Sequence, residues 1–367
     1  MKVPARFVLL VLLASTACAC ATIPEPAGGD VGLPNAGAGP FRPLTSTEIG
    51  NNRSGPNGLT DSRGYARDIA VIDLDGKPDT FDVAGFVAAS ITVNGMDPTP
   101  ASPTRTIVRY GALDGRSFDH AALVVLTPDA AWEGGVLEAP AVVRAGSELF
   151  LYYAAAGGIG VARGDAAGMS FTKVPGPVLA PVAGGWEAGT TPRSPGVVKL
   201  DDGTFLMFYE VPLTSGSVLG EARSSDGVSF TRLGSGPALG GATGATSAGD
   251  AGDLLYDAAG VGSPSPMLAI SGDGRPILRV YYGATDSTGT RTIGLAARYG
   301  TDGPLQRGLT PVFGTGKPLQ PREPCVVAFT GFSLLYATEL SATTDKDPAI
   351  AVGVAPATAM MPPPMPP

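Results

Sequence analysis

The residues that could do chemistry in this chain are mainly carboxylates and arginines at the starts of strand-like segments. They are Arg67 and Asp68, Glu138, Arg193, and the pair Arg322 and Glu323. Carboxyl groups can act as general acids or bases. Arginine guanidinium groups bind oxyanions through paired hydrogen bonds and suit hydroxyl-rich ligands as well. The sequence therefore points to acid–base chemistry or to recognition of an anionic or hydroxyl-rich ligand.

A further acid, Glu210, directly follows the aromatic pair Phe208-Tyr209. The corresponding positions after three similar aromatic segments hold small residues, Ala154, Gly283 and Ala337. An acid at a position where its counterparts are small is a candidate catalytic residue, with exposure at a strand end as the alternative.

Composition excludes several other kinds of site. The chain has one histidine, His120, so neither a Ser-His-Asp triad nor a histidine-based metal site is expected. It has three cysteines, two of them near the N-terminus, which excludes a disulfide framework and disfavours thiolate zinc. We expect no metal and no cofactor. A net charge of −8, from 25 basic and 33 acidic residues, argues against nucleic acid as a partner.

The N-terminus has the features of an export signal over residues 1–17. Lys2 and Arg6 precede a short apolar run at 7–13, which is too short to span a bilayer. The following Ser-Thr-Ala-Cys resembles a bacterial lipobox, which implies lipidation of Cys18, with Cys20 as the alternative acceptor and plain secretion as the alternative fate. By resemblance, Ala19 after Cys18 favours the outer membrane. We expect a Pro/Gly-rich tether at 18–45, membrane contact through the lipid only, and a disordered tail at 359–367.

The rest of the chain is organised by internal repeats. Four segments begin with two residues and a proline and end in an aromatic pair or a single tyrosine, with their prolines at Pro140, Pro195, Pro266 and Pro324. A third strand pattern follows each of them, at 159–162, 219–222, 293–296 and 350–353. An earlier unit opens near Arg67, and the Asp226-Gly227 pair marks a hairpin turn.

Five units of about 50–70 residues, each with about four short strands, predict an all-β fold, a five-bladed β-propeller of four-stranded antiparallel blades over residues 46–358. The 52 glycines and 35 prolines fit many turns and crowded inner strands. We expect the paired tyrosines and the two tryptophans, Trp132 and Trp186, to pack in the core, and the protein to be a monomer.

The run from Trp132 to Leu179, nearly repeated in the next unit, resembles the five-bladed propeller glycosidases of the arabinanase, levansucrase and invertase superfamily, particularly family 43-type glycoside hydrolases. The resemblance covers about residues 60–355. It implies paired carboxylates where the inner strands begin, one protonating the glycosidic oxygen and the other activating water or attacking carbon.

Residue by residue, the resemblance carries over in part. Asp68 matches the position of the general base, although Ile69 stands where a proline is usual. The second unit has Ala141 where the family commonly has an aspartate, and Glu138 could occupy similar space. In the third unit Arg193 replaces the general acid, so Glu210 is a candidate substitute.

Two functions from different classes remain. The first is an exported, lipid-anchored glycoside hydrolase acting on poly- or oligosaccharides, with Asp68 as base and Glu138 or Glu210 as acid. Arg67, Arg193, Arg322 and Glu323 would then bind substrate. The second is a catalytically inactive propeller that binds glycan or protein at the cell envelope. For each of these charged residues the alternative is an ion pair that serves only the fold. Two carboxylates about 5–10 Å apart in an open pocket would favour the hydrolase.

Overall fold

Five antiparallel sheets of four strands, each forming one blade, make up the described part of the molecule in this computed structural model. The structure describes residues 38–45, 48, 65–75, 82–90, 104–112, 115–116, 118, 123–241, 256–270, 275–308, 310–316, 319–329, 332–341 and 344–356. Blades one and two contain β2 Tyr65–Asp73, β3 Val83–Ser90, β4 Arg105–Ala112 and β5 Leu123–Leu126, then β6 Glu138–Ala145, β7 Glu148–Ala155, β8 Gly158–Gly164 and β9 Phe171–Lys173. Blades three and four contain β10 Arg193–Lys199, β11 Phe205–Leu213, β12 Gly216–Ser224 and β13 Thr231–Leu233, then β14 Gly260–Ile270, β15 Pro276–Thr285, β16 Arg291–Tyr299 and β17 Gln306–Arg307. Blade five contains β18 Leu319–Phe329, β19 Phe332–Ser341, β20 Thr344–Pro356 and, from the start of the chain, β1 Arg42–Pro43.

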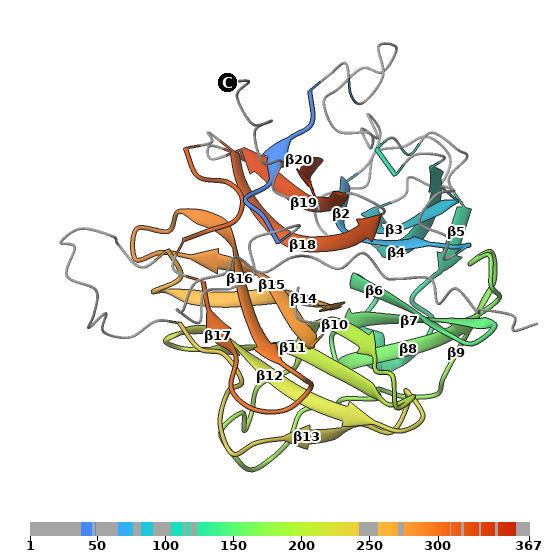
Figure 1. The fold of residues 1–367 in the computed structure, drawn as a ribbon. Coiled ribbons are helices and arrows are strands. Elements are labelled where there is room, and N and C mark those ends of the chain that lie inside the picture. The colour runs from blue at the N-terminus through green and yellow to red at the C-terminus, as the bar shows by residue number, and fades with distance from the viewer. Residues whose placement is uncertain are drawn as a thin grey trace, which may run out of the picture.

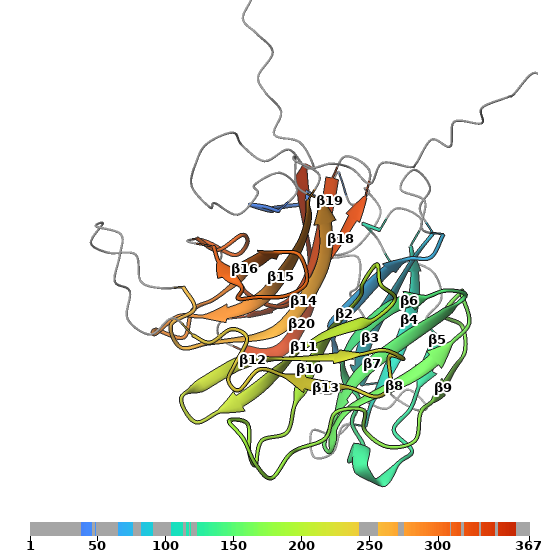
Figure 2. The ribbon, with the colours of Figure 1, turned by 60° about the horizontal axis from the view of Figure 1, so that its bottom comes forward.

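The five blades form a closed ring around an axis. The first strands of the blades, β2, β6, β10, β14 and β18, contact one another in that order, and β18 contacts β2 again. Figures 1 and 2 show the blades arranged radially, with these strands innermost. The prediction of a five-bladed propeller with four-stranded antiparallel blades is confirmed. Among the described residues, no helix is long and apolar enough to cross a membrane.

The last blade is completed by the beginning of the chain. Strand β1 pairs antiparallel with β20, with Arg42 opposite Val354. Phe41 is buried and packs edge-on against Tyr281, with ring centroids 5.9 Å apart. The propeller therefore begins several residues before the expected boundary at 46, because its last sheet takes its outer strand from this segment. The signal segment, Cys18, His120 and the tail at 359–367 lie outside the described residues.

A buried acid–tyrosine–base group recurs in three blades and explains one of the sequence repeats. The acid follows an aromatic residue before the blade begins, accepts a hydrogen bond from the second-strand tyrosine, and pairs with a basic residue of the outer strand. The groups are Glu133 with Tyr153 and Lys173, Glu187 with Tyr209 and Arg232, and Asp257 with Tyr282 and Arg307. The charges stay buried because each is paired and hydrogen-bonded.

The glycine of each third-strand repeat makes room for this tyrosine. Gly160, Gly220 and Gly294 lie directly opposite Tyr153, Tyr209 and Tyr282 in the sheet register. A Cβ atom at these three glycines would come within 2.5, 2.3 and 2.5 Å of the tyrosine Cζ atom. The tyrosine ring crosses the neighbouring strand there, so only glycine fits. The expected core position of the paired tyrosines is confirmed, since these side chains are fully buried.

Candidate functional site

Each inner strand carries an irregularity at the same place, and these five places surround the axis. The register with the second strand shifts at Asp68 and across Ala139-Pro140, Ser194-Pro195, Ser263-Pro264 and Glu323-Pro324. The residue at each bulge has a positive φ between 45° and 57°, a left-handed conformation that costs energy for any residue other than glycine. The bulges therefore define five equivalent positions: Asp68, Ala139, Ser194, Ser263 and Glu323.

This equivalence corrects the sequence alignment of the fourth unit. The sequence placed Pro266 with Pro140, Pro195 and Pro324, but the structure aligns Pro264 with them. Both prolines of the Pro-Ser-Pro run fit the x-x-Pro motif, and only the position of the bulge shows which one is equivalent to the prolines of the other blades. The blade-four residues at the mouth are therefore Gly262 and Ser263.

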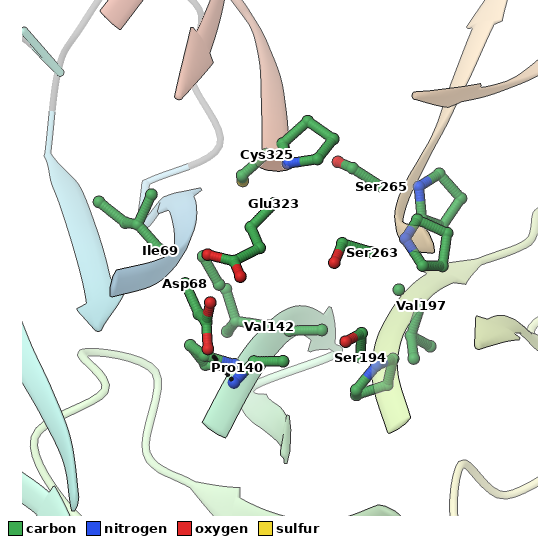
Figure 3. Close-up of a pocket in the computed structure, with 18 of the residues that line it drawn as sticks. Asp68, Ile69, Pro140, Val142, Ser194, Val197, Ser263, Ser265, Glu323 and Cys325 are labelled. Carbon is green, nitrogen blue, oxygen red and sulfur yellow. Dashed lines mark hydrogen bonds between the residues drawn. The ribbon is translucent and has the colours of Figure 1, made fainter. Parts of the chain in front are cut away.

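Two cavities lie along the axis beside the bulges. The axial cavity, about 110 Å³, is lined by the starts of all five inner strands, and Figure 3 shows Asp68, Glu323, Ser194 and Ser263 around it. The mouth cavity, about 440 Å³, adjoins it, since the five bulge residues line both. It brings together all seven charged residues that the sequence singled out, namely Arg67, Asp68, Glu138, Arg193, Glu210, Arg322 and Glu323.

The carboxyl groups of Asp68 and Glu323 form the centre of the site. Arg67 connects them, with its Nε 3.1 Å from Asp68 Oδ1 and its Nη2 2.9 Å from Glu323 Oε1. The backbone N–H of Ala139 donates to Asp68 Oδ2 at 3.0 Å. Thr338 is buried, and its hydroxyl accepts the N–H of Asp68 at 3.0 Å. These contacts hold both carboxyl groups in fixed positions.

The environment shifts the pKa values of these two carboxyl groups in opposite directions. Burial, followed by the charge of Asp68, raises the pKa of Glu323 well above its usual range. Burial alone would raise the pKa of Asp68 too, but the hydrogen bond from Glu323, the charge of Arg67 and the Ala139 N–H hold that pKa below its usual value. Glu323 is therefore the weaker acid of the two and Asp68 the stronger.

Glu210 is held in an ion pair with Arg193. Both Nε and Nη2 of Arg193 donate to Glu210 Oε1, at 3.1 and 2.6 Å. Ser217 donates its hydroxyl to the same oxygen at 2.8 Å, and the Ser263 N–H donates to Oε2 at 3.1 Å. Glu210 is buried, whereas half of the Arg193 side chain is exposed. Four hydrogen bonds from three residues therefore hold the Glu210 carboxyl group in place beside Arg193.

Glu138 is likewise paired, with Arg105 of the neighbouring blade. Glu138 lies one residue before the bulge of its blade, at Ala139, whereas Asp68 occupies the bulge itself. The two side chains therefore start from different positions on their strands. Glu138 therefore makes an ion pair between blades and also lines the mouth cavity.

The site also contains residues that the sequence did not single out. Ser194 and Ser263 occupy bulge positions, and Arg291 lines the mouth cavity from the start of β16. The x-x-Pro repeat could have identified the two serines, because each directly precedes the aligned proline. No sequence pattern marks Arg291. Cys325 lines the axial cavity, where it is half-buried, and burial raises the pKa of its thiol to about 11.

The arrangement differs from the carboxylate pattern that the family resemblance implies. Only blades one and five carry an acid at the bulge, and blades two and three carry Ala139 and Ser194. Asp68 and Glu323 are instead linked through Arg67, which contacts both carboxyl groups, at 3.1 and 2.9 Å. In the part of the chain that the structure describes, no group of three or more His, Cys, Asp or Glu residues could hold a metal ion.

Comparison with solved structures places the fold among propellers described as glycoside hydrolases. A glycosyl hydrolase from Bacteroides ovatus is 12% identical, with a TM-score of 0.59 over 86% of this chain and 93% of that one. A thermostable family-43 glycoside hydrolase is 13% identical, with a TM-score of 0.53 over 82% and 91%. A structure described with the GH130 family of mannoside phosphorylases is 14% identical, with a TM-score of 0.57 over 87% and 95%.

The similarity is confined to the fold. No protein-family model matches the chain, and no curated protein matches it. The resemblance to glycosidase propellers that the repeats indicated is therefore confirmed at the level of architecture.

Proposed function

We propose that this protein is a saccharide-binding propeller of glycosidase-like fold, which binds its ligand in the mouth cavity and does not hydrolyse it. One observation carries the proposal: the mouth cavity gathers the arginines and carboxylates of the site, and two of its acids are neutralised by arginines. A cavity of about 440 Å³ with convergent polar groups suits a small ligand or one or two sugar units.

Binding without hydrolysis agrees with the state of the acids. A glycosidase needs a proton donor and a base on either side of the scissile bond. Glu210 and Glu138, the expected acids, are in ion pairs with Arg193 and Arg105. Asp68 and Glu323 are both contacted by Arg67, so neither carboxyl group is free of an arginine.

A second candidate function, hydrolysis, is favoured by the opposed pKa values of Asp68 and Glu323. Two carboxyl groups whose pKa values are driven apart are the usual signature of an acid–base pair. In this alternative Glu323 donates its proton to the glycosidic oxygen and Asp68 acts as the base.

A screen of oligosaccharides with the purified protein separates the two functions. Each ligand is tested for binding by calorimetry and for cleavage by chromatography of the products. The proposal expects binding without new products. Cleavage that disappears in both Asp68→Asn and Glu323→Gln would establish hydrolysis instead. A screen with neither binding nor cleavage would refute both functions.

We further propose that the protein is exported and anchored at the cell envelope by lipid on Cys18, on the basis of the N-terminal sequence. Membrane fractionation and mass spectrometry of the N-terminal peptide test this. Wild type should carry acyl chains on Cys18, and Cys18→Ala should leave the membrane fraction. Acylation at Cys20, or none, would contradict it.

A further inference from the structure

We propose that the ligand of the mouth cavity is an acidic saccharide, and that Arg291 together with Arg193 binds the carboxylate of a uronic acid unit. This inference rests on the proposed saccharide-binding function and names its ligand class.

Arg291 is the first reason. It opens β16 beside the end of β15, lines the mouth cavity and is half-buried. Among the described residues, no hydrogen bond or ion pair engages its guanidinium group. A partly buried arginine that has no protein partner and lines a cavity is available to an anionic ligand.

Arg193 is the second reason. Its Nε and Nη2 are both directed to one oxygen of Glu210, which fixes the plane of the guanidinium group. Within the described part of the chain, its Nη1 has no partner, and half of the side chain is exposed where it lines the cavity. Glu210 thus orients Arg193 and leaves one edge of the fork free for a ligand.

The charge balance of the cavity is the third reason. Four arginines line it, together with four carboxyl groups, in a protein whose net charge is −8. One of these carboxyl groups, Glu138, is already paired with Arg105 from outside the lining, so five arginines face four carboxyl groups at the mouth. The mouth is therefore locally positive on an acidic protein, which favours an anion there.

The remaining lining fits the rest of a sugar. Ser194, Ser217 and Ser263 line the cavity with groups that hydrogen-bond hydroxyls, and Asp68 adds an acceptor. The blade-four side of the cavity, next to Arg291, has few side chains because it is lined by Gly260, Gly262 and Gly283. A pyranose ring can lie on such a surface while its carboxylate reaches the two arginines.

Calorimetric titration with matched oligosaccharides tests the inference. The probes are short galacturonate, glucuronate and mannuronate oligomers, each compared with the same oligomer after reduction of its carboxyl groups to alcohols. A sulfated neutral oligomer of the same length distinguishes sulfate from carboxylate. We expect at least one uronate series to bind about tenfold or more tightly than its reduced counterpart.

Three variants locate the effect. Arg291→Gln should weaken uronate binding about tenfold and leave the reduced oligomer unchanged, and Arg291→Lys should lose less because it keeps the charge. Arg223→Gln is the control, since it makes the same change in net charge on blade three, where Arg223 pairs with Asp302 outside the cavity. Thermal melts verify folding of each variant.

The outcomes separate this inference from the proposed function. Equal binding of uronate and reduced oligomers, preference for the sulfated oligomer, or equal losses in Arg291→Gln and Arg223→Gln would overturn the uronate assignment while saccharide binding stands. Failure of every saccharide to bind would refute the proposed function and the inference with it.

Discussion

Asp68 and Glu323 meet at the junction of the first and last blades, where Arg67 contacts both carboxyl groups, at 3.1 and 2.9 Å. Arg67 and Glu323 are 256 residues apart in the sequence, and closure of the ring alone brings them together. The contacts between these residues therefore depend on closure of the propeller as well as on the chemistry of the site.

The stability contributed by this pair should depend on pH in opposite ways for its two members. The raised pKa of Glu323 gives stability that is complete below about 4.5, the ordinary value, and is lost as pH rises through the folded pKa. The lowered pKa of Asp68 gives stability that is present above its ordinary value of 3.8 and is lost as pH falls through the folded pKa.

Glu323→Gln should therefore gain in Tm relative to wild type as pH rises above about 4.5, because the amide cannot ionise. Asp68→Asn should lose about 2 kcal/mol at neutral pH, as its contacts with Arg67 and the Ala139 N–H weaken, and less in acid. Melting curves between acid and alkaline pH measure both. Glu148→Gln, on an exposed hairpin, is the control. A Glu323→Gln profile parallel to wild type would show that Glu323 is ionised in the folded protein.

The buried Glu187–Tyr209–Arg232 group should be a main source of blade stability. Glu187→Gln leaves the Arg232 cation without its partner and should cost about 2–3 kcal/mol. Tyr209→Phe removes only the hydroxyl that donates to Glu187 at 3.0 Å and should cost about 1 kcal/mol. Urea unfolding of the two variants gives the comparison. If Glu187→Gln costs no more than Tyr209→Phe, the ion pair contributes nothing measurable.

Gly220 should not tolerate a side chain. A Cβ there would lie 2.3 Å from Tyr209 Cζ, so Gly220→Ala must displace a buried ring and should cost about 3 kcal/mol. Gly236→Ala is the control, because a Cβ at Gly236 has nothing within 4 Å. Urea denaturation should give a large loss for the first and little change for the second. Similar free energies of unfolding would mean that Tyr209 does not cross at Gly220.

The N-terminal strand should hold the ring closed. Phe41→Ala removes a buried ring that packs on Tyr281 and should cost about 3–4 kcal/mol. Arg42→Ala, on the exposed side of the same strand, breaks only a surface ion pair with Glu48 and should cost less than about 1 kcal/mol. Thermal unfolding distinguishes them. If the Phe41→Ala protein were as stable as Arg42→Ala, this segment would contribute nothing to the propeller and would belong to the tether.

The repeats predicted the fold well because the propeller is built from local patterns. Each pattern marks a particular strand of a blade. The x-x-Pro motif marks the first strand, the tyrosine pair the second and the glycine the third. Strand β1 escaped prediction because two residues carry no pattern, and its partner β20 lies at the far end of the chain. The fourth blade was misaligned because Pro264 and Pro266 fit the same motif.

The sequence predicted which charged residues gather at the candidate site but not which of them contact each other. The seven charged residues do meet at one mouth, since inner strands of a propeller begin at the same end of the axis. The sequence favoured Asp68 with Glu138 or Glu210, whereas the structure pairs Asp68 with Glu323 and engages the other two acids with arginines. Pairing depends on which blades are neighbours and on side-chain direction at each bulge, and neither is encoded in a local motif. Arg291 has no motif at all.

Blocking the mouth cavity without altering its charges tests most directly whether the ligand binds there. Gly283 lines the cavity, and a Cβ there meets nothing closer than 3.6 Å, so Gly283→Trp should fill the space. Gly184→Trp, at a position with nothing within 4 Å and outside the cavity, is the control. Calorimetry with the best saccharide from the screen should show binding to wild type and Gly184→Trp and at least a hundredfold loss in Gly283→Trp, with no cleavage by any of the three. Equal affinity in all three proteins would contradict the placement of the binding site in the mouth cavity.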